Sequence, residues 1–221
     1  MKIALKILIP LFIIAVIFLL AMRYKQASAP STVPNNQTAP QNIAVPNQNP
    51  LTISNFQPPL DRAKERITKK PFGIYITPAA SPVQPEKFQG YHTGTDFEIF
   101  PEELKIDVPV KAICSGKLIV KEYASGYGGV AIESCSFNNN PMTIIYGHLK
   151  LASITSKVND ALNVGDTIGI LGAAKSVETD GERKHLHLGF HNGSAINIRG
   201  YVASQSELSG LIDPCLYLCS N

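Results

Sequence analysis

Residues 26–60 divide the chain into two parts and limit how much of it can form a compact domain. This segment contains no charged side chain, and seven Pro, six Asn and five Gln stand among its 35 residues. It shows no apolar periodicity, so it cannot bury enough surface to offset the entropy lost on folding. We therefore predict a disordered linker over 26–60, a separate segment over 1–25 and a folded domain over 61–221.

The first 25 residues combine an apolar run, from Ile7 to Met22, with positive charges at both ends. The flanking basic residues are Lys2, Lys6, Arg23 and Lys25. As a helix, the run would measure roughly 24 Å, slightly less than the hydrocarbon core of about 30 Å. We expect a single-pass transmembrane helix with the rest of the chain outside the cytoplasm. The alternative is a secretory signal that is cleaved near Ala29, which the basic residues directly after the run disfavour.

These four charges account for the net charge of the chain. Its 20 basic and 17 acidic side chains give +3, and without the four the balance is 16 basic against 17 acidic. The remainder is therefore near neutral, and no Lys/Arg run marks it as a nucleic-acid-binding surface. We expect contact with the membrane through the N-terminal helix and no nucleic-acid partner, and the sequence identifies no protein partner.

The four cysteines fit an exported domain. Cys114 and Cys135 lie symmetrically about Ala124 and Ser125, beside the turn-rich stretch 125–129, so a hairpin there would place them opposite each other. A disulfide that closes this loop could add roughly 3 kcal/mol of stability. Cys215 and Cys219 are one helical turn apart. Other pairings remain open, as do four free buried thiols.

From residue 72 onwards, short apolar runs alternate with Gly, Pro and Asn, and no long helical pattern is present. Such runs are typical of strands. The predicted strands cover 73–76, 95–99, 108–122, 129–134, 143–146, 167–171 and 185–190. The charged stretch 61–70 could form a short helix that ends before Pro71. The sequence therefore predicts a mainly β, antiparallel domain.

The histidines give the most specific indication of chemistry. His185 and His187 stand at i and i+2, so on a strand both side chains point to one face. His92 is followed by Asp96 four residues later. Imidazole and carboxylate groups suit zinc, and a hydrolytic zinc site uses three protein ligands and one open position for water. Either motif alone is weak, but together they predict a zinc site of His92, Asp96 and one histidine of the pair.

These motifs resemble the lysostaphin-type, or LytM-like, zinc metallopeptidases over about residues 70–218. The matching motifs are His92-x-x-x-Asp96, Tyr146-Gly147-His148-Leu149 and His185-Leu186-His187, with the turn Gly126-Tyr127-Gly128 and the run 164–169 of the scaffold. The resemblance implies an antiparallel β-sandwich related to the barrel-sandwich architecture, with a cleft across one sheet. Members of that family cut peptide bonds in bacterial peptidoglycan, in the stem peptide or in the crossbridge.

The resemblance also implies a role for each residue of the motifs. His92, Asp96 and His187 would bind one zinc ion. His148 and His185 would stay off the metal and face the substrate as catalytic residues, one as the base and both stabilising the tetrahedral intermediate. Which of the two is the base is left open.

The chain departs from the family pattern just before the His185-Leu186-His187 motif. Glu182, Arg183 and Lys184 stand where small residues and a Pro are common, and 173–183 is expected to rim the cleft. These charges bear on substrate preference more than on catalysis. His191 has no counterpart in the motifs, and we expect it at the surface.

We therefore predict a membrane-anchored zinc endopeptidase that hydrolyses peptides of peptidoglycan. One alternative is a non-catalytic LytM-like regulator that activates another cell-wall hydrolase, and the other is a β-barrel binding module without chemistry. All five positions of the motifs are present, which argues against the regulator. The linker could in principle occupy the cleft, with Asn49 or Asn55 reaching the zinc.

Overall fold

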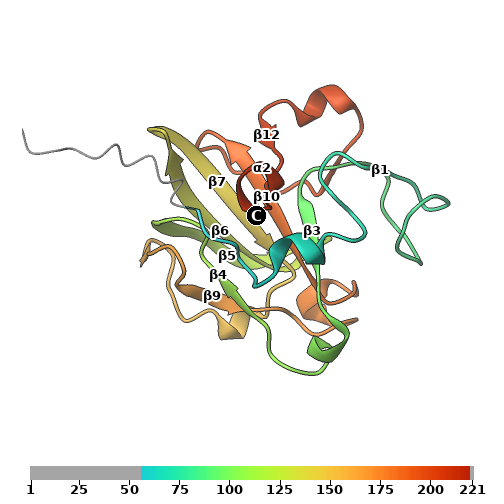
Figure 1. The fold of residues 1–221 in the computed structure, drawn as a ribbon, viewed down its shortest axis with the longest axis horizontal. Helices are drawn as coiled ribbons and strands as arrows, with labels where there is room; N and C mark the ends of the chain where they lie inside the picture. Colours follow the sequence, from blue (N-terminus) through green and yellow to red (C-terminus); the bar gives the residue numbers. More distant parts are fainter. Residues whose placement is uncertain (1–55, 220–221) are drawn as a thin grey trace, which may run out of the picture. The chain divides into compact units, whose positions relative to one another are not determined.

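The computed structural model describes residues 56–219 (Figure 1). The predicted membrane segment 1–25 and residues 26–55 of the predicted linker lie outside the described residues. Among the helices of the described part, none combines the length and the hydropathy needed to cross a bilayer.

One large antiparallel sheet of seven strands forms the framework of the domain. Its strands are β12 (Leu211–Ile212), β10 (His185–Asn192), β7 (Asn140–Gly147), β6 (Gly128–Phe137), β5 (Gly116–Ala124) and β8 (Ala161–Leu162), in that order, with β3 (Thr95–Glu98) paired to β10. The β5–β6 and β6–β7 pairs are hairpins, so the centre of the sheet is local in sequence. The prediction of a mainly β, antiparallel domain is confirmed.

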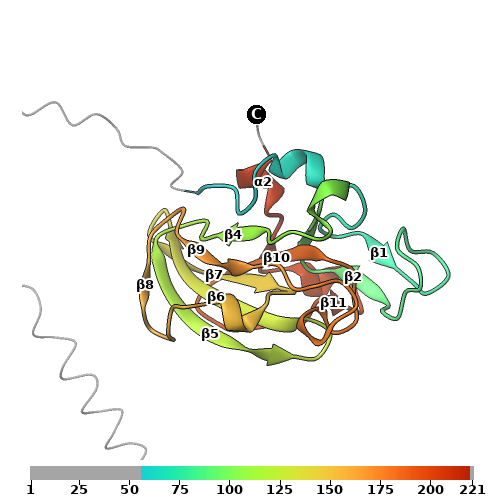
Figure 2. The ribbon, with the colours of Figure 1, turned by 90° about the horizontal axis from the view of Figure 1, so that it is seen from below.

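Two smaller sheets and several short helices complete the domain. β1 (Tyr75–Ile76), β2 (Gly90–His92) and β11 (Tyr201–Val202) form one sheet, and β4 (Pro109–Lys111) pairs with β9 (Thr167–Ile170) in the other. The 3-10 helices are η1 (Ala63–Arg66), η2 (Pro101–Glu103), η3 (Leu151–Ser153), η4 (Val177–Thr179) and η5 (Gln205–Leu208), and the α-helix is α2 (Cys215–Leu218). Figure 2 shows β4 lying over one face of the large sheet, with α2 beyond it. The predicted helix over 61–70 is thus only the four residues of η1, and the predicted strand over 108–122 is two strands, β4 and β5.

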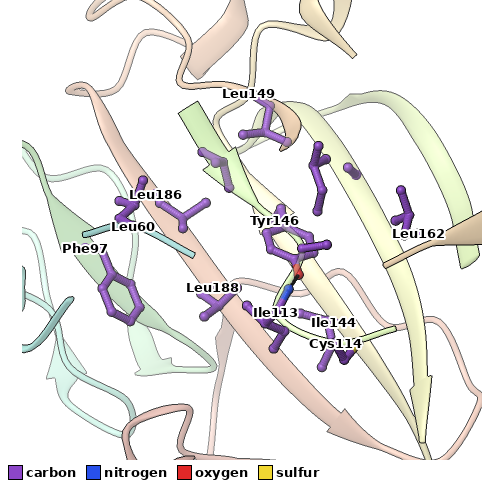
Figure 3. Close-up of a cluster of buried hydrophobic side chains, with 14 of the residues drawn as sticks. Leu60, Phe97, Ile113, Cys114, Ile144, Tyr146, Leu149, Leu162, Leu186 and Leu188 are labelled. Atoms are coloured by element: carbon purple, nitrogen blue, oxygen red, sulfur yellow. Dashed lines mark hydrogen bonds between the residues drawn. The ribbon is translucent and has the colours of Figure 1, made fainter. Parts of the chain in front are cut away.

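Alternation along β10 separates the core from the opposite face of the sheet. Leu186, Leu188 and Phe190 are fully buried and belong to the main hydrophobic core, together with Ile144 and Tyr146 of β7 (Figure 3). Positions 185, 187 and 189 alternate with these core residues and lie on the other face of the sheet, because successive residues of a strand face opposite sides. One strand therefore anchors the core and presents the His-x-His motif at the same time.

The aromatic core extends the folded domain into the predicted linker. Phe56 is buried, and its ring lies 5.2 Å from that of Phe137 and 5.4 Å from that of Tyr217. Leu60 is buried in the same core. The polar composition of 26–60 as a whole gave no indication that these two apolar side chains would be buried. Residues 56–60 of the predicted linker therefore belong to the folded domain.

Both pairs of cysteines form disulfides, Cys114 with Cys135 and Cys215 with Cys219. The first disulfide joins the residues just before β5 to β6, as the symmetry about the β5–β6 turn predicts. The second closes the short helix α2. The interpretation as free thiols is wrong.

His191 is buried, so its predicted place at the surface is wrong. Only 5 % of the residue is exposed, and it pairs with Thr143 of β7 and Leu211 of β12. The Thr143 hydroxyl donates to the carbonyl of Ala195, which shows that the chain after β10 folds back over this end of the sheet. Burial and the nearby Arg199 lower the pKa of His191 to about 4, so the ring is neutral near pH 7.

The carboxyl group of Glu133 is fully buried beside the core residue Tyr146. Its Oε2 accepts a hydrogen bond of 2.6 Å from the Tyr146 hydroxyl, which itself accepts one of 3.0 Å from the Ile113 amide. Its Oε1 has no hydrogen-bond partner in the described part of the chain. Burial raises the pKa of Glu133 to about 7, because the charged form is poorly solvated there.

We expect Glu133 to make the domain less stable as the pH rises. Between its ordinary pKa of 4.5 and the folded value of about 7, the unfolded chain loses a proton that the folded chain keeps. The free energy of unfolding should therefore fall by up to about 3 kcal/mol across this window. Glu133→Gln should remove this part of the slope in urea titrations at pH 4.5 to 8. Glu122→Gln, at an exposed position of β5, is the control, and equal slopes for the wild type and Glu133→Gln would contradict the assignment.

Candidate active site

Three strands bring the predicted metal ligands together. His92 ends β2, Asp96 lies in β3 and His187 in β10, and the β3–β10 register places Asp96 directly opposite His187. The turn between His92 and Asp96 passes against β10 at Gly94. A Cβ at this position would lie 2.5 Å from the Leu188 carbonyl oxygen and 2.7 Å from a His187 ring nitrogen, so no larger residue fits.

The donor atoms of these residues form a triangle with the dimensions of a zinc site. His92 Nε2 lies 3.0 Å from His187 Nδ1 and 3.3 Å from Asp96 Oδ1, and His187 Nδ1 lies 3.1 Å from Asp96 Oδ1. A tetrahedral zinc with bonds of about 2.0–2.1 Å has donors about 3.3–3.4 Å apart. The side chains present therefore fit one zinc ion, with one position left open.

Each of the two candidate histidine ligands is held through its other ring nitrogen. His92 Nδ1 lies 3.2 Å from the Pro71 carbonyl oxygen, which can only accept, so Nδ1 donates to it and Nε2 faces the other donor atoms of the triangle. His187 Nε2 lies 3.2 Å from the Tyr127 hydroxyl. Such contacts orient the rings of metal-binding histidines and fix their tautomers.

The cluster is desolvated, and its charges compensate one another. Burial by itself would raise the pKa of Asp96, but the nearby His185 and His92 and hydrogen bonds from His185 and His187 hold it well below the ordinary value. Burial lowers the pKa of His187 to about 4. Near pH 7 the site therefore offers a carboxylate and a neutral imidazole, the forms that bind a divalent metal.

His148 and His185 lie beside this triangle, with ring centroids 4.2 Å apart. His148 follows β7 in a left-handed backbone conformation, with a φ of 63°, which is uncommon for a non-glycine residue. It is 4 % exposed, and its Nδ1 has no hydrogen-bond partner among residues 56–219. Burial, and then the neighbouring His185, lower its pKa well below the ordinary value, so the ring is neutral.

A cleft of about 290 Å³ opens over the five predicted residues. Its other lining residues are Lys70, Phe88, Ser125, Gly126, Tyr127, Glu182, Arg183, Ile198, Arg199, Gly200 and Tyr201. The structure thus brings together every predicted site residue. It also shows that 182 and 183 reach the cleft, whereas Lys184 turns inward and donates to the carbonyl oxygens of Glu103 and Ile106.

Two tyrosines of the cleft were not predicted as site residues. The Tyr127 ring lies 5.1 Å from that of His187, and burial raises the pKa of its hydroxyl, which stays protonated. The Tyr201 ring lies 5.2 Å from both His92 and Phe88, and its hydroxyl accepts from Lys70. The position of Tyr127 in a Gly-Tyr-Gly turn was a usable signal, since an aromatic residue at such a turn is placed close to the sheet. No local pattern marks Tyr201.

Comparisons with known proteins find one matching family model and several similar proteins. Residues 90–198 match the model of peptidase family M23. The endolysin 2638A of Staphylococcus phage 2638A is 33 % identical over 99 residues, which cover 45 % of this chain but only 18 % of the endolysin. Similar solved structures include the catalytic domain of lysostaphin from Staphylococcus simulans (24 % identity, 68 % of this chain, 90 % of that chain, TM-score 0.46) and LytU (25 %, 69 %, 83 %, 0.47).

We predict that Asp96→Ala and His187→Ala each weaken zinc binding by more than about a hundredfold, because each removes one of three donors and outer partners alone contribute 10–100-fold. The affinity for zinc is measured by competition for zinc between the metal-free protein and a chromophoric chelator. His191→Gln, a change at a buried histidine outside the triangle, should leave the affinity for zinc unchanged. Wild-type affinity in Asp96→Ala would show that the metal binds elsewhere.

Proposed function

We propose that the domain, of which residues 90–198 match the model of peptidase family M23, is a zinc-dependent endopeptidase that hydrolyses peptide bonds in bacterial peptidoglycan. The observation that carries the proposal is the triangle of His92 Nε2, Asp96 Oδ1 and His187 Nδ1, with sides of 3.0–3.3 Å. Zinc bound there would supply an acidified water and polarise the scissile carbonyl group.

The protein's own groups would move the proton. His185 Nδ1 donates to the Arg183 carbonyl oxygen at 2.9 Å, so Nε2 points to the side of Asp96 and the cleft. His148 is neutral and has an unpartnered nitrogen in the same cleft. Two adjacent imidazoles in the cleft can accept the proton of the attacking water and return it to the leaving amine.

Tyr127 would bind the oxygen that becomes negative in the reaction. With Nδ1 of His187 turned to the metal, its Nε2 carries the proton and donates to the Tyr127 oxygen. The hydroxyl proton of Tyr127 is then free to point into the cleft. A fixed donor aimed at developing charge in a desolvated cleft is an effective source of transition-state stabilisation.

The domain is proposed to act outside the cytoplasm, held at the membrane by residues 1–25, with secretion after cleavage near Ala29 as the alternative. The two disulfides support an oxidising compartment, because such bonds are rare in the reducing cytosol. Peptidoglycan peptides would be the partner, from the stem or the crossbridge.

The full chain, loaded with zinc, should release peptides from purified sacculi, and a chelator should abolish the release. His148→Ala and His185→Ala should keep zinc bound but lower the rate by about 10²–10⁴-fold, as for loss of a general acid or base. Mass spectrometry of the new termini identifies the bond. A zinc-loaded protein that releases nothing, but stimulates another hydrolase even as His187→Ala, would instead be a regulator.

A further inference from the structure

A ladder of charged and polar side chains crosses β3 and β10 on the cleft side. The register pairs His185 with Glu98 and His187 with Asp96. Arg183 lies two residues before His185, so its side chain extends the same face of the chain. The ladder therefore sets two carboxylates of β3 against two imidazoles and a guanidinium at β10.

The Arg183 guanidinium joins both carboxylates. Its Nη2 donates to Asp96 Oδ2 at 2.8 Å, and its Nε lies 2.9 and 3.0 Å from the two oxygens of Glu98. The Arg183 side chain is only 14 % exposed, and that of Asp96 is 3 % exposed. A desolvated, forked contact of this kind has a fixed geometry that a lysine cannot reproduce.

This contact decides how Asp96 can act as a ligand. With Oδ2 occupied by Arg183, only Oδ1 faces His92 and His187, at 3.3 and 3.1 Å. The main chain of the same residue holds His185, whose Nδ1 donates to the Arg183 carbonyl oxygen. That bond leaves Nε2 on the cleft side, 3.3 Å from Asp96 Oδ2.

We propose that Arg183 is a positioning residue that restricts Asp96 to one metal-binding oxygen and orients His185 with Nε2 towards the cleft. Arg183 thus serves the architecture of the site, and Lys184 is turned inward to the carbonyl oxygens of Glu103 and Ile106. The guanidinium is already shared by two carboxylates, so it has no free charge to offer a substrate carboxylate. The use of the oriented His185 in proton transfer rests on the proposed function, whereas the part of the proposal that concerns Asp96 does not.

The test compares Arg183→Met with Arg199→Met, a matched change at an arginine that lines the same cleft but bonds to Glu207. In the metal-free full chain, Arg183→Met should lower the affinity for zinc by about 10–100-fold, and Arg199→Met should not change it. With cobalt(II) in place of zinc, Arg183→Met should weaken the visible absorption, because a freed Asp96 carboxylate binds through both oxygens and raises the coordination number. A purely structural role of Arg183 would not produce that change of spectrum.

Zinc affinity within twofold of the wild type in Arg183→Met, or an unchanged cobalt spectrum, would overturn the proposal for Asp96. If Arg183→Met does not fold, Arg183→Lys, which can contact only one carboxylate well, decides by the same two measurements. A two-bond ¹H–¹⁵N spectrum of the wild type should show a proton on His185 Nδ1, which donates to the Arg183 carbonyl oxygen, and an Nδ1 without a proton would overturn the orientation of His185. These readouts need no substrate, so they remain decisive if the protein releases no peptides.

Discussion

The antiparallel pairing of β3 with β10 is the constraint on which the rest of the site depends. It sets Asp96 opposite His187 and Glu98 opposite His185, and it places all four on the face away from the core. A slip of one residue would turn the acidic side chains into the core and the leucines into the cleft. The burial of Leu186 and Leu188 therefore fixes the register that the chemistry requires.

Desolvation gives this arrangement its chemical character. Four histidines of the cleft and Asp96 are each at most 4 % exposed, in an environment where an unpaired charge would be costly. The carboxylate is stabilised by its histidine neighbours and by Arg183, while burial keeps His148 and His187 neutral. The result is one anionic ligand beside the neutral imidazoles of His148 and His187. Such a set binds a divalent cation and leaves neutral nitrogens free for proton transfer.

Much of this could be predicted because it depends on local pattern. Period-two alternation located the strand of His185 and His187, and the turn at 125–129 located the hairpin that brings Cys114 to Cys135. The boundary between linker and domain was predicted less well, because the average composition of 26–60 does not reveal that Phe56 and Leu60 pack in the core. The buried position of His191 was missed because it depends on a later segment that folds back over the sheet.

The sequence by itself determined the strand-rich domain, the five residues that meet in the cleft and the chemistry to which they are suited, since residue type and spacing along a strand decide these. Only the tertiary structure decided which atoms meet. Residues 87 positions apart, Asp96 and Arg183, share a hydrogen bond, and Tyr127 reaches His187 across 60 positions. Local periodicity carries no information on such contacts, because they arise when separate strands pack at a fixed register and bury the groups between them.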